Sequence, residues 1–405
     1  MYSFVFADKG LAGAVYEITA AEDIITPDGT LRYAKGTVAD TVTTDENGKA
    51  ESKPLYLGKY EIREIKAPYG MVLNGTEKTV ELTVISGNPP ATAARHKVNS
   101  LHRFSFCKIF AALMDCDLLL SGGGSLLQDV TSKRSLLYYL FILALGLLLK
   151  KKVMLFGHGI GPIHNRLMRR LTKFICSRVD LITVRDQDSL YELRRIGVPA
   201  EKVQLTADSV LTLPQESKEK GLELLQQFGV PQDKMLIAIS VRKWQEDDKY
   251  LLELAKAADI LAKEYKAHIV LLPLQYPVDV AACNRLQHFM RRKADSTVLE
   301  TGCDTEQFLS LMGNFNLLIG MRLHALIFAA VMELPFVAVS YDPKIDGFVK
   351  DINGISAGAV ETLQAAQVVS SARKALASAN AAHGLLDTLR AKAFLNAKEA
   401  FDLLN

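Results

Sequence analysis

The chain has 405 residues, of which 49% are hydrophobic and 23% are charged, and its formal net charge is +3. This length corresponds to two or three domains of about 150 residues, and this composition excludes wholesale disorder. Lys and Arg (48) nearly balance Asp and Glu (45), whereas a dedicated nucleic-acid binder usually carries a basic stripe. We therefore expect no nucleic-acid partner.

The charge is unevenly distributed along the chain. Residues 1–82 carry a net charge of −4 and the remainder carries +7. A basic body suits anionic substrates or an anionic membrane surface, and a mildly basic solvated surface explains the imbalance equally well.

The first 82 residues have the pattern of a small β-sandwich. Short runs rich in Val, Ile, Thr and Tyr are separated by turn signals at 27–29, 46–48 and 57–59. The N-terminus MYSFVFADKG lacks the basic start and the long apolar run of a secretory signal. We expect a cytoplasmic protein, with peripheral contact at the inner face of the membrane as a further feature.

From Val84 onward, strand-like and helix-like segments alternate, which is typical of parallel sheets with crossover helices. The expected strands are 153–157, 180–184, 203–206, 235–241, 268–272, 316–320 and 335–340, and the expected helices include 186–196, 249–264, 305–312 and the tail 361–405. A hinge near 212–232 would separate two Rossmann-type halves. The predicted domains are 1–82, 83–215 and 216–405.

The apolar run at 135–149 has 15 residues, and spanning a bilayer takes roughly 20. We interpret it as a buried helix between two strands. The alternative is a helix near a membrane surface, with the lysines at 150–152 among the headgroups.

Two glycine-rich segments are candidate substrate-binding loops. Gly122, Gly123 and Gly124 follow an expected strand, and we expect them to open a helix whose N-terminus binds an anion or a sugar. Gly159 and Gly161 lie at the end of the next strand, in FGHGIGPI (156–163). A tight strand-to-helix turn would favour glycine as well.

Two side chains near the second segment can each be interpreted in two ways. His158 either faces a ligand or is a satisfied turn residue. Arg166, on the helix expected after this segment, either contacts an anion or belongs to a solvated basic face.

The richest stretch is GMRLHALIFA (320–329), where a strand runs into a helix that carries Arg322 and His324. Ligands of open α/β sheets bind at this edge of the sheet. Arg is a permanent anion contact and His can donate or accept a proton near neutral pH. Lys344, in a loop after the next strand, and Arg242, after another strand of this half, complete a cationic set that suits a small phosphorylated acid.

Asp208, in ADSVL, ends the first half of the α/β region and either faces the cleft or caps the next helix. No HExxH motif, Walker A loop, nucleophile elbow or zinc-ligand spacing is present, so the sequence predicts neither a metal site nor a covalent Ser or Cys mechanism.

The N-terminal piece resembles the prealbumin-like modules of Cna-B and SpaA type found in Gram-positive surface proteins. LAGAVYEI (11–18), TTDENGKA (43–50), LYLGKYEIREIKAP (55–68) and YGMVL (69–73) carry the resemblance. Glu64 matches the glutamate that promotes the isopeptide bond of such modules. The expected Lys and Asn partners are absent, so we expect no isopeptide bond.

The remainder resembles the polysaccharide pyruvyl transferase family, most closely its CsaB type. The matching blocks are ISGNP, LLLSGGGSLLQDVTSKRSLLYYL, GIGPI, VDLITVRDQDSLYELRRIGV, SVRKW, GMRLHALIFA and SYDPKIDGF. The resemblance implies a metal-independent GT-B-like fold. It also implies transfer of a pyruvyl group from phosphoenolpyruvate, without a further cofactor, to a hexosamine of a lipid-linked cell-wall glycan as a 4,6-ketal.

The resemblance also implies roles for individual residues. His324 would protonate the enol carbon of phosphoenolpyruvate, and Arg322 and Lys344 would hold its phosphate and carboxylate. Arg166 would be a further anion contact.

We interpret the whole chain as a pyruvyl transferase body that follows a non-catalytic N-terminal module. The family's opening strand, Gly-rich loop and helix have no counterpart ahead of ISGNP, so we expect a truncated first half and impaired transfer. The two pieces imply different compartments, which also fits a chimaeric fusion at 81–89. The alternatives are a GT-B glycosyltransferase that uses a nucleotide sugar, and a non-enzymatic surface protein built on the N-terminal module.

Overall fold

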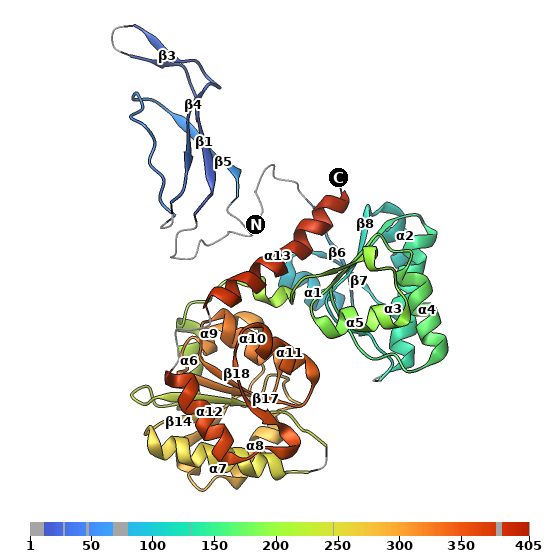
Figure 1. Ribbon diagram of the computed structural model, residues 1–405, viewed down its shortest axis with the longest axis vertical. Coiled ribbons are helices and arrows are strands. Elements are labelled where there is room, and N and C mark those ends of the chain that lie inside the picture. Colours follow the sequence, from blue (N-terminus) through green and yellow to red (C-terminus); the bar gives the residue numbers. More distant parts are fainter. Residues whose placement is uncertain are drawn as a thin grey trace. The chain divides into compact units, whose positions relative to one another are not determined.

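The computed structural model describes residues 12–26, 29–45, 48–67, 80–130, 132–245, 247–377 and 383–404. The chain divides into two compact units, residues 1–117 and 118–405. The N-terminal segment MYSFVFADKG (1–10) and the block YGMVL (69–73) lie outside the described residues. Figure 1 shows the elements along the chain.

The first unit begins with antiparallel β structure. β1 (Val15–Ala20) pairs with both β4 (Val38–Thr43) and β5 (Tyr60–Lys66), and β2 (Ile24–Ile25) pairs with β3 (Leu31–Tyr33). The β pattern predicted for this region is confirmed.

A parallel crossover follows in the same unit. β6 (Thr83–Ser86) leads through α1 (Pro89–His96) to its parallel partner β7 (Asn99–His102), and α2 (Phe106–Asp115) ends the unit. The Asn88 side chain caps α1 by accepting the Ala91 N–H, so the ISGNP segment is a strand-to-helix turn.

The second unit begins with a five-stranded parallel sheet of order β12-β11-β10-β8, in which β9 also pairs with β10. Its elements are β8 (Leu118–Ser121), β9 (Gly124–Leu127), α3 (Lys133–Leu148), β10 (Lys152–Ile160), α4 (Arg166–Cys176), β11 (Leu181–Val184), α5 (Gln187–Ile196) and β12 (Val203–Leu205). Val153 and Leu155 of β10 point to the face covered by α3, α4 and α5. The continuous apolar run at the start of β10 made this strand predictable.

The sheet of the second half has six parallel strands in the order β15-β14-β13-β16-β17-β18. The elements, in chain order, are α6 (Glu219–Gln227), β13 (Leu236–Ser240), α7 (Lys249–Glu264), β14 (His268–Leu271), α8 (Val280–Phe289), β15 (Ser296–Val298), α9 (Thr305–Met312), β16 (Leu317–Gly320), α10 (Leu323–Val331), β17 (Phe336–Ser340), α11 (Pro343–Asp351), β18 (Ile355–Ala359), α12 (Ala365–Ala377) and α13 (His383–Leu404). Short 3₁₀ turns lie at Ala200–Lys202, Ser209–Thr212, Lys293–Asp295 and Val360–Thr362.

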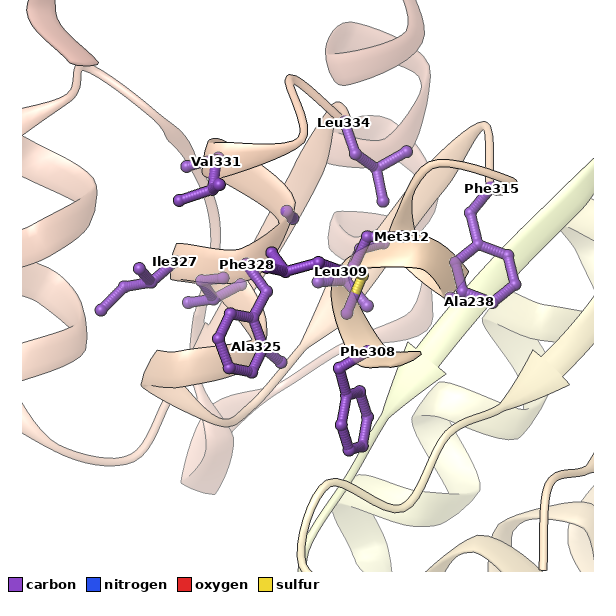
Figure 2. Close-up of a cluster of buried hydrophobic side chains, with 14 of the residues drawn as sticks. Ala238, Phe308, Leu309, Met312, Phe315, Ala325, Ile327, Phe328, Val331 and Leu334 are labelled. Carbon is purple, nitrogen blue, oxygen red and sulfur yellow. The ribbon is translucent and has the colours of Figure 1, made fainter. Parts of the chain in front are cut away.

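Both faces of this sheet are buried. Ala238 of β13 faces α9 and α10, and Ile237 and Ile239 face α7, α8 and α12. Figure 2 shows the first of these cores, in which Phe308 and Phe328 stack at 6.1 Å between ring centroids. The expected α/β architecture of parallel sheets with crossover helices is confirmed.

The run at 135–149 forms most of α3, which lies between β9 and β10 as expected. No helix in the described part of the chain is long and apolar enough to cross a membrane. The side of α3 that faces the sheet is buried, whereas Leu137, Phe141 and Leu148 are exposed.

Candidate functional site

The strand order of the second half defines where a ligand should bind. The winding direction reverses between β13 and β16, and open α/β sheets bind ligands outside the carboxyl ends of the strands at such a reversal. Arg242 follows β13, Arg322 and His324 follow β16, and Lys344 follows β17. The structure therefore brings all four predicted residues of this half to one sheet edge.

His324 lies in the first turn of α10. The other residues of this helix are buried, whereas the His324 side chain is 44% exposed. Apolar packing around α10 thus fixes the backbone that presents the imidazole. An exposed imidazole at the start of a rigid helix is well placed to exchange a proton with a bound ligand.

Asp208 faces His324 from the other half of this unit. Its Oδ2 lies 3.8 Å from His324 Nε2 and accepts a hydrogen bond of 2.7 Å from Arg185 Nη1. Its Oδ1 accepts the N–H of Val210, so Asp208 also caps the next 3₁₀ turn. The interpretation of Asp208 as a cap is therefore confirmed, and its position in a ligand-binding cleft stays a prediction.

The Asp208 carboxylate is buried yet ionised. Burial acts to raise its pKa, but His324 and the Arg185 guanidinium outweigh burial and hold the pKa at about 2. At neutral pH the site therefore carries a fixed negative charge beside the imidazole.

Arg185 also contacts Ser125, which follows the first glycine-rich segment. Its Nη2 donates to Ser125 Oγ at 3.2 Å. A Cβ on Gly159 would lie 2.8 Å from Ser125 Oγ and 2.9 Å from Arg185 Nε. Glycine at 159 therefore makes room for this guanidinium.

The expectation that Gly122–Gly124 open a helix is wrong. Gly122 and Gly123 connect β8 to β9, Gly124 begins β9 with φ of +98°, and α3 starts only at Lys133. β9 takes this course because it pairs with the second part of β10, a partner about 35 residues further along the chain. No helix N-terminus is available for an anion at this loop.

The second glycine-rich segment lies mostly inside β10 rather than after it. Gly159 belongs to the strand and Gly161 follows it, with Gln128 Cβ only 2.6 Å from where a Cβ on Gly161 would be. Substrate binding by these two glycines stays a prediction, and packing against side chains is their observed environment.

His158 is neither a ligand-facing nor a turn residue. It is fully buried in β10, with Nε2 3.1 Å from Ser121 Oγ. Burial lowers its pKa to about 4, so the ring is neutral at physiological pH.

Arg322 has a carboxylate partner that the sequence did not suggest. Its Nη2 contacts Asp279 Oδ1 at 2.5 Å and Gln275 Oε1 at 3.1 Å, and the Asp279 side chain is only 1% exposed. The guanidinium is thus oriented by a buried anion from beyond the end of β14. Its contact with a ligand phosphate stays a prediction.

Arg242 and Lys344 follow β13 and β17, the two strands that flank β16. Lys344 lies in the first turn of α11 rather than in a loop, because Asp342 caps this helix, and its Nζ is 3.1 Å from Asp342 Oδ2. Arg242 donates to Tyr341 Oη at 2.9 Å and lies over the Tyr341 ring. Tyr341 thus links the edges after β13 and β17.

Arg166 is exposed at the first residue of α4, which Asn165 caps. Its role as an anion contact stays a prediction. Within the described ranges, no group of three or more His, Cys, Asp or Glu side chains is arranged to hold a metal ion.

Sequence reasoning missed Arg185, Ser125 and Asp279 as parts of this arrangement. Arg185 follows β11 and Asp279 lies beyond β14, so both come after the carboxyl ends of parallel strands. The rule that singled out Arg322 and Arg242 would have found Arg185 if applied to the first half.

Comparison with models of protein families identifies the family of the chain. Residues 71–343, about two thirds of the chain, match the model of the polysaccharide pyruvyl transferases. The chain belongs to this family. Residues 7–92 match the SpaA prealbumin-like fold domain, so the two matches overlap at 71–92.

One curated relative is the amylovoran biosynthesis protein AmsJ of Erwinia amylovora, which is 25% identical over 261 residues. The match covers 59% of this pyruvyl transferase-family chain and 60% of the AmsJ chain. The chain therefore matches less than two thirds of the length of this relative.

Solved structures share the GT-B-like fold at low sequence identity. UDP-GlcNAc 2-epimerase from Methanocaldococcus jannaschii has a TM-score of 0.56 at 10% identity, covering 77% of this chain and 89% of its own. Anabaena HepE in complex with UDP-glucose has a TM-score of 0.53 at 12% identity, covering 77% and 87%. At these identities the likeness shows the fold alone.

Proposed function

We propose that the protein transfers the pyruvyl group of phosphoenolpyruvate to two hydroxyls of a hexosamine in a lipid-linked cell-wall glycan, forming a 4,6-ketal. The observation that carries the proposal is the half-exposed His324 at the reversal point of the second sheet, 3.8 Å from the ionised Asp208. Family membership and the biosynthetic role of AmsJ support a transferase acting in polysaccharide synthesis.

His324 supplies the proton in the first step. The protonated imidazole donates to the methylene carbon of phosphoenolpyruvate, which becomes the methyl group, and the enol carbon becomes oxocarbenium-like. One sugar hydroxyl attacks this carbon and loses its proton. The C–O bond to phosphate then breaks, and the second hydroxyl attacks and loses its proton to close the ketal, leaving inorganic phosphate.

The cations at the strand ends hold the anionic groups of the substrate. Lys344 and Arg242 are partly exposed and lie after the strands on either side of β16, and Arg322 is already oriented by Asp279. Fixed positive charges that bind the departing phosphate lower the barrier to its loss. Asp208, fixed by Arg185, is a positioning residue that orients the imidazole.

Ligand-dependent heat stability separates this function from a nucleotide-sugar glycosyltransferase. A ligand that binds only the folded state raises the melting temperature. We expect phosphoenolpyruvate to raise the Tm of the full chain by a few degrees at millimolar concentration, and UDP-glucose to leave it unchanged.

The variant Lys344→Ala should reduce the rise in Tm that phosphoenolpyruvate causes. Stabilisation by UDP-glucose without stabilisation by phosphoenolpyruvate would contradict the proposal and support the glycosyltransferase. The predicted impairment of transfer is tested separately, by comparing the rate of phosphate release with that of another family member.

A further inference from the structure

Acidic residues are absent from one long stretch of the chain. Residues 130–179 contain ten Lys and Arg and no Asp or Glu, whereas the other 355 residues contain 38 Lys and Arg and 45 Asp and Glu. The excess positive charge of the protein is thus confined to these 50 residues.

This stretch forms α3, β10 and α4, and the two helices pack side by side on one face of the first sheet of the second unit (Figure 1). Leu136, Leu140 and Leu143 of α3, and Met168 and Ile175 of α4, are buried against that sheet. The opposite sides of both helices therefore point away from the sheet.

Those outward sides are apolar as well as basic. The exposed fractions are 43% for Leu137, 77% for Leu148, 58% for Leu167 and 57% for Phe174. Residues 135–149 contain no charged side chain at all, although this chain buries only one side of α3. A helix that is apolar all round is normally buried on every side, in a protein core or in a membrane.

Basic residues frame these apolar side chains. Arg170 and Lys173 lie on the exposed part of α4, and the Arg178 guanidinium lies 3.6 Å from the centroid of the Phe174 ring. Lys133 and Arg134 lie at one end of α3, and the three lysines at 150–152 follow its other end. Apolar side chains flanked by Lys and Arg, on a stretch of sequence without Asp or Glu, complement a surface that is negatively charged outside and apolar beneath.

We propose that this basic-apolar face, formed by the outward sides of α3 and α4, docks the protein on a bilayer that contains anionic phospholipid. Leu137, Leu148, Leu167 and Phe174 would enter the boundary between headgroups and acyl chains, as the apolar faces of interfacial helices do. The surrounding Lys and Arg would be attracted to the lipid phosphates of an anionic surface. Docking is peripheral, because α3 has 16 residues and no described helix can cross a membrane.

The inference goes beyond the proposed transfer reaction and does not depend on it. A surface that holds the protein at the membrane would bring it to any lipid-linked substrate, whatever chemistry follows. The residues of this face are separate from Asp208, His324 and the strand ends that form the candidate site.

Flotation of the full chain with lipid vesicles tests the proposal. We expect binding to vesicles of phosphatidylcholine with 30% phosphatidylglycerol at about 0.1 M salt, and little binding to phosphatidylcholine alone. The double variant Arg170→Glu/Lys173→Glu should lower the partition coefficient at least about tenfold, because it replaces two attractions by two repulsions. The double variant Leu148→Ser/Phe174→Ser should weaken binding without changing the charge.

Matched controls make the same chemical changes in the second half. Lys263→Glu/Lys293→Glu has the same net charge as the first variant, and Leu252→Ser/Ile260→Ser removes two exposed apolar side chains. Both should bind vesicles like the wild type. Circular dichroism and a thermal melt of each variant exclude loss of folding as the cause.

Two results would overturn the proposal. One is equal binding to zwitterionic and anionic vesicles, or none to either. The other is a partition coefficient of the α4 charge variant that equals that of its matched control. A wild-type chain that dimerises in sedimentation velocity and does not float with vesicles would instead assign this face to a second copy of the chain.

Discussion

Arg185 is the residue that holds the candidate site together. It contacts Asp208 through one nitrogen and Ser125 through another, and its side chain is only 7% exposed. Asp208 in turn faces His324. The position of the imidazole therefore depends on residues that lie as far apart in the sequence as Ser125 and His324. Removing one partner of a buried ion pair is strongly destabilising, so this arrangement tolerates little change.

Gly159→Ala tests whether this packing matters. The added methyl group would lie 2.8 Å from Ser125 Oγ and 2.9 Å from Arg185 Nε, so both side chains must move. We expect a loss of about 1–3 kcal/mol in the free energy of unfolding, measured by urea denaturation. Gly122→Ala is the control, because no heavy atom lies within 4 Å of its Cβ position. Equal stability of the two variants would contradict the packing role of Gly159.

At the scale of elements, α13 ties the two halves of the second unit together. Its Leu386 and Leu389 belong to the core of the second half, and Asn396, further along the helix, is fully buried against the first half. Asn396 accepts from Thr206 Oγ1 at 2.8 Å and donates to the carbonyl of Ala207 at 3.0 Å. These bonds lie next to Asp208, so α13 supports the site from behind.

Asn396→Ala should therefore lower stability and activity together. The substitution leaves the hydroxyl of Thr206 and the carbonyl of Ala207 without these bonds, at a cost of about 1–3 kcal/mol. The measurement is the urea midpoint, with Lys398→Ala on the exposed side of the same helix as the control. A variant as stable as wild type would show that α13 does not brace this part of the site.

The elements that the sequence predicted well are those with strong local patterns. β10, β13, β16 and β17 are continuous apolar runs, and each was expected to within a few residues. β15 and β18 were missed because they are edge strands, one with three residues and one, ISAGA, built largely of small side chains. β9 was mistaken for the start of a helix, because only its pairing with β10 makes it a strand.

The candidate site was predictable in part for the same reason. The ends of β13, β16 and β17 could be placed at one sheet edge from the alternation of strands and helices. The pairing of Arg322 with Asp279, and of Asp208 with Arg185, depends on side-chain geometry between segments far apart in sequence. Such contacts have no signature in a single sequence.

At the scale of the whole molecule, the two proposed functions use charged residues in different places. The buried Asp208 carboxylate lies beside the partly exposed His324, whereas the acid-free stretch of the sequence forms α3, β10 and α4. A prealbumin-like module precedes this pyruvyl transferase body. The proposed chemistry and the proposed membrane attachment thus lie in different parts of the second unit.

The central claim is that His324 donates the proton that starts transfer. The most direct measurement is phosphate release from phosphoenolpyruvate with a hexosaminide acceptor that has free 4- and 6-hydroxyls. We predict that His324→Ala lowers kcat at least about 100-fold and changes KM little, because general acid catalysis contributes about 100- to 10,000-fold. His288→Ala, an exposed histidine on α8, should match the wild type. Turnover by His324→Ala at the wild-type rate would contradict the account.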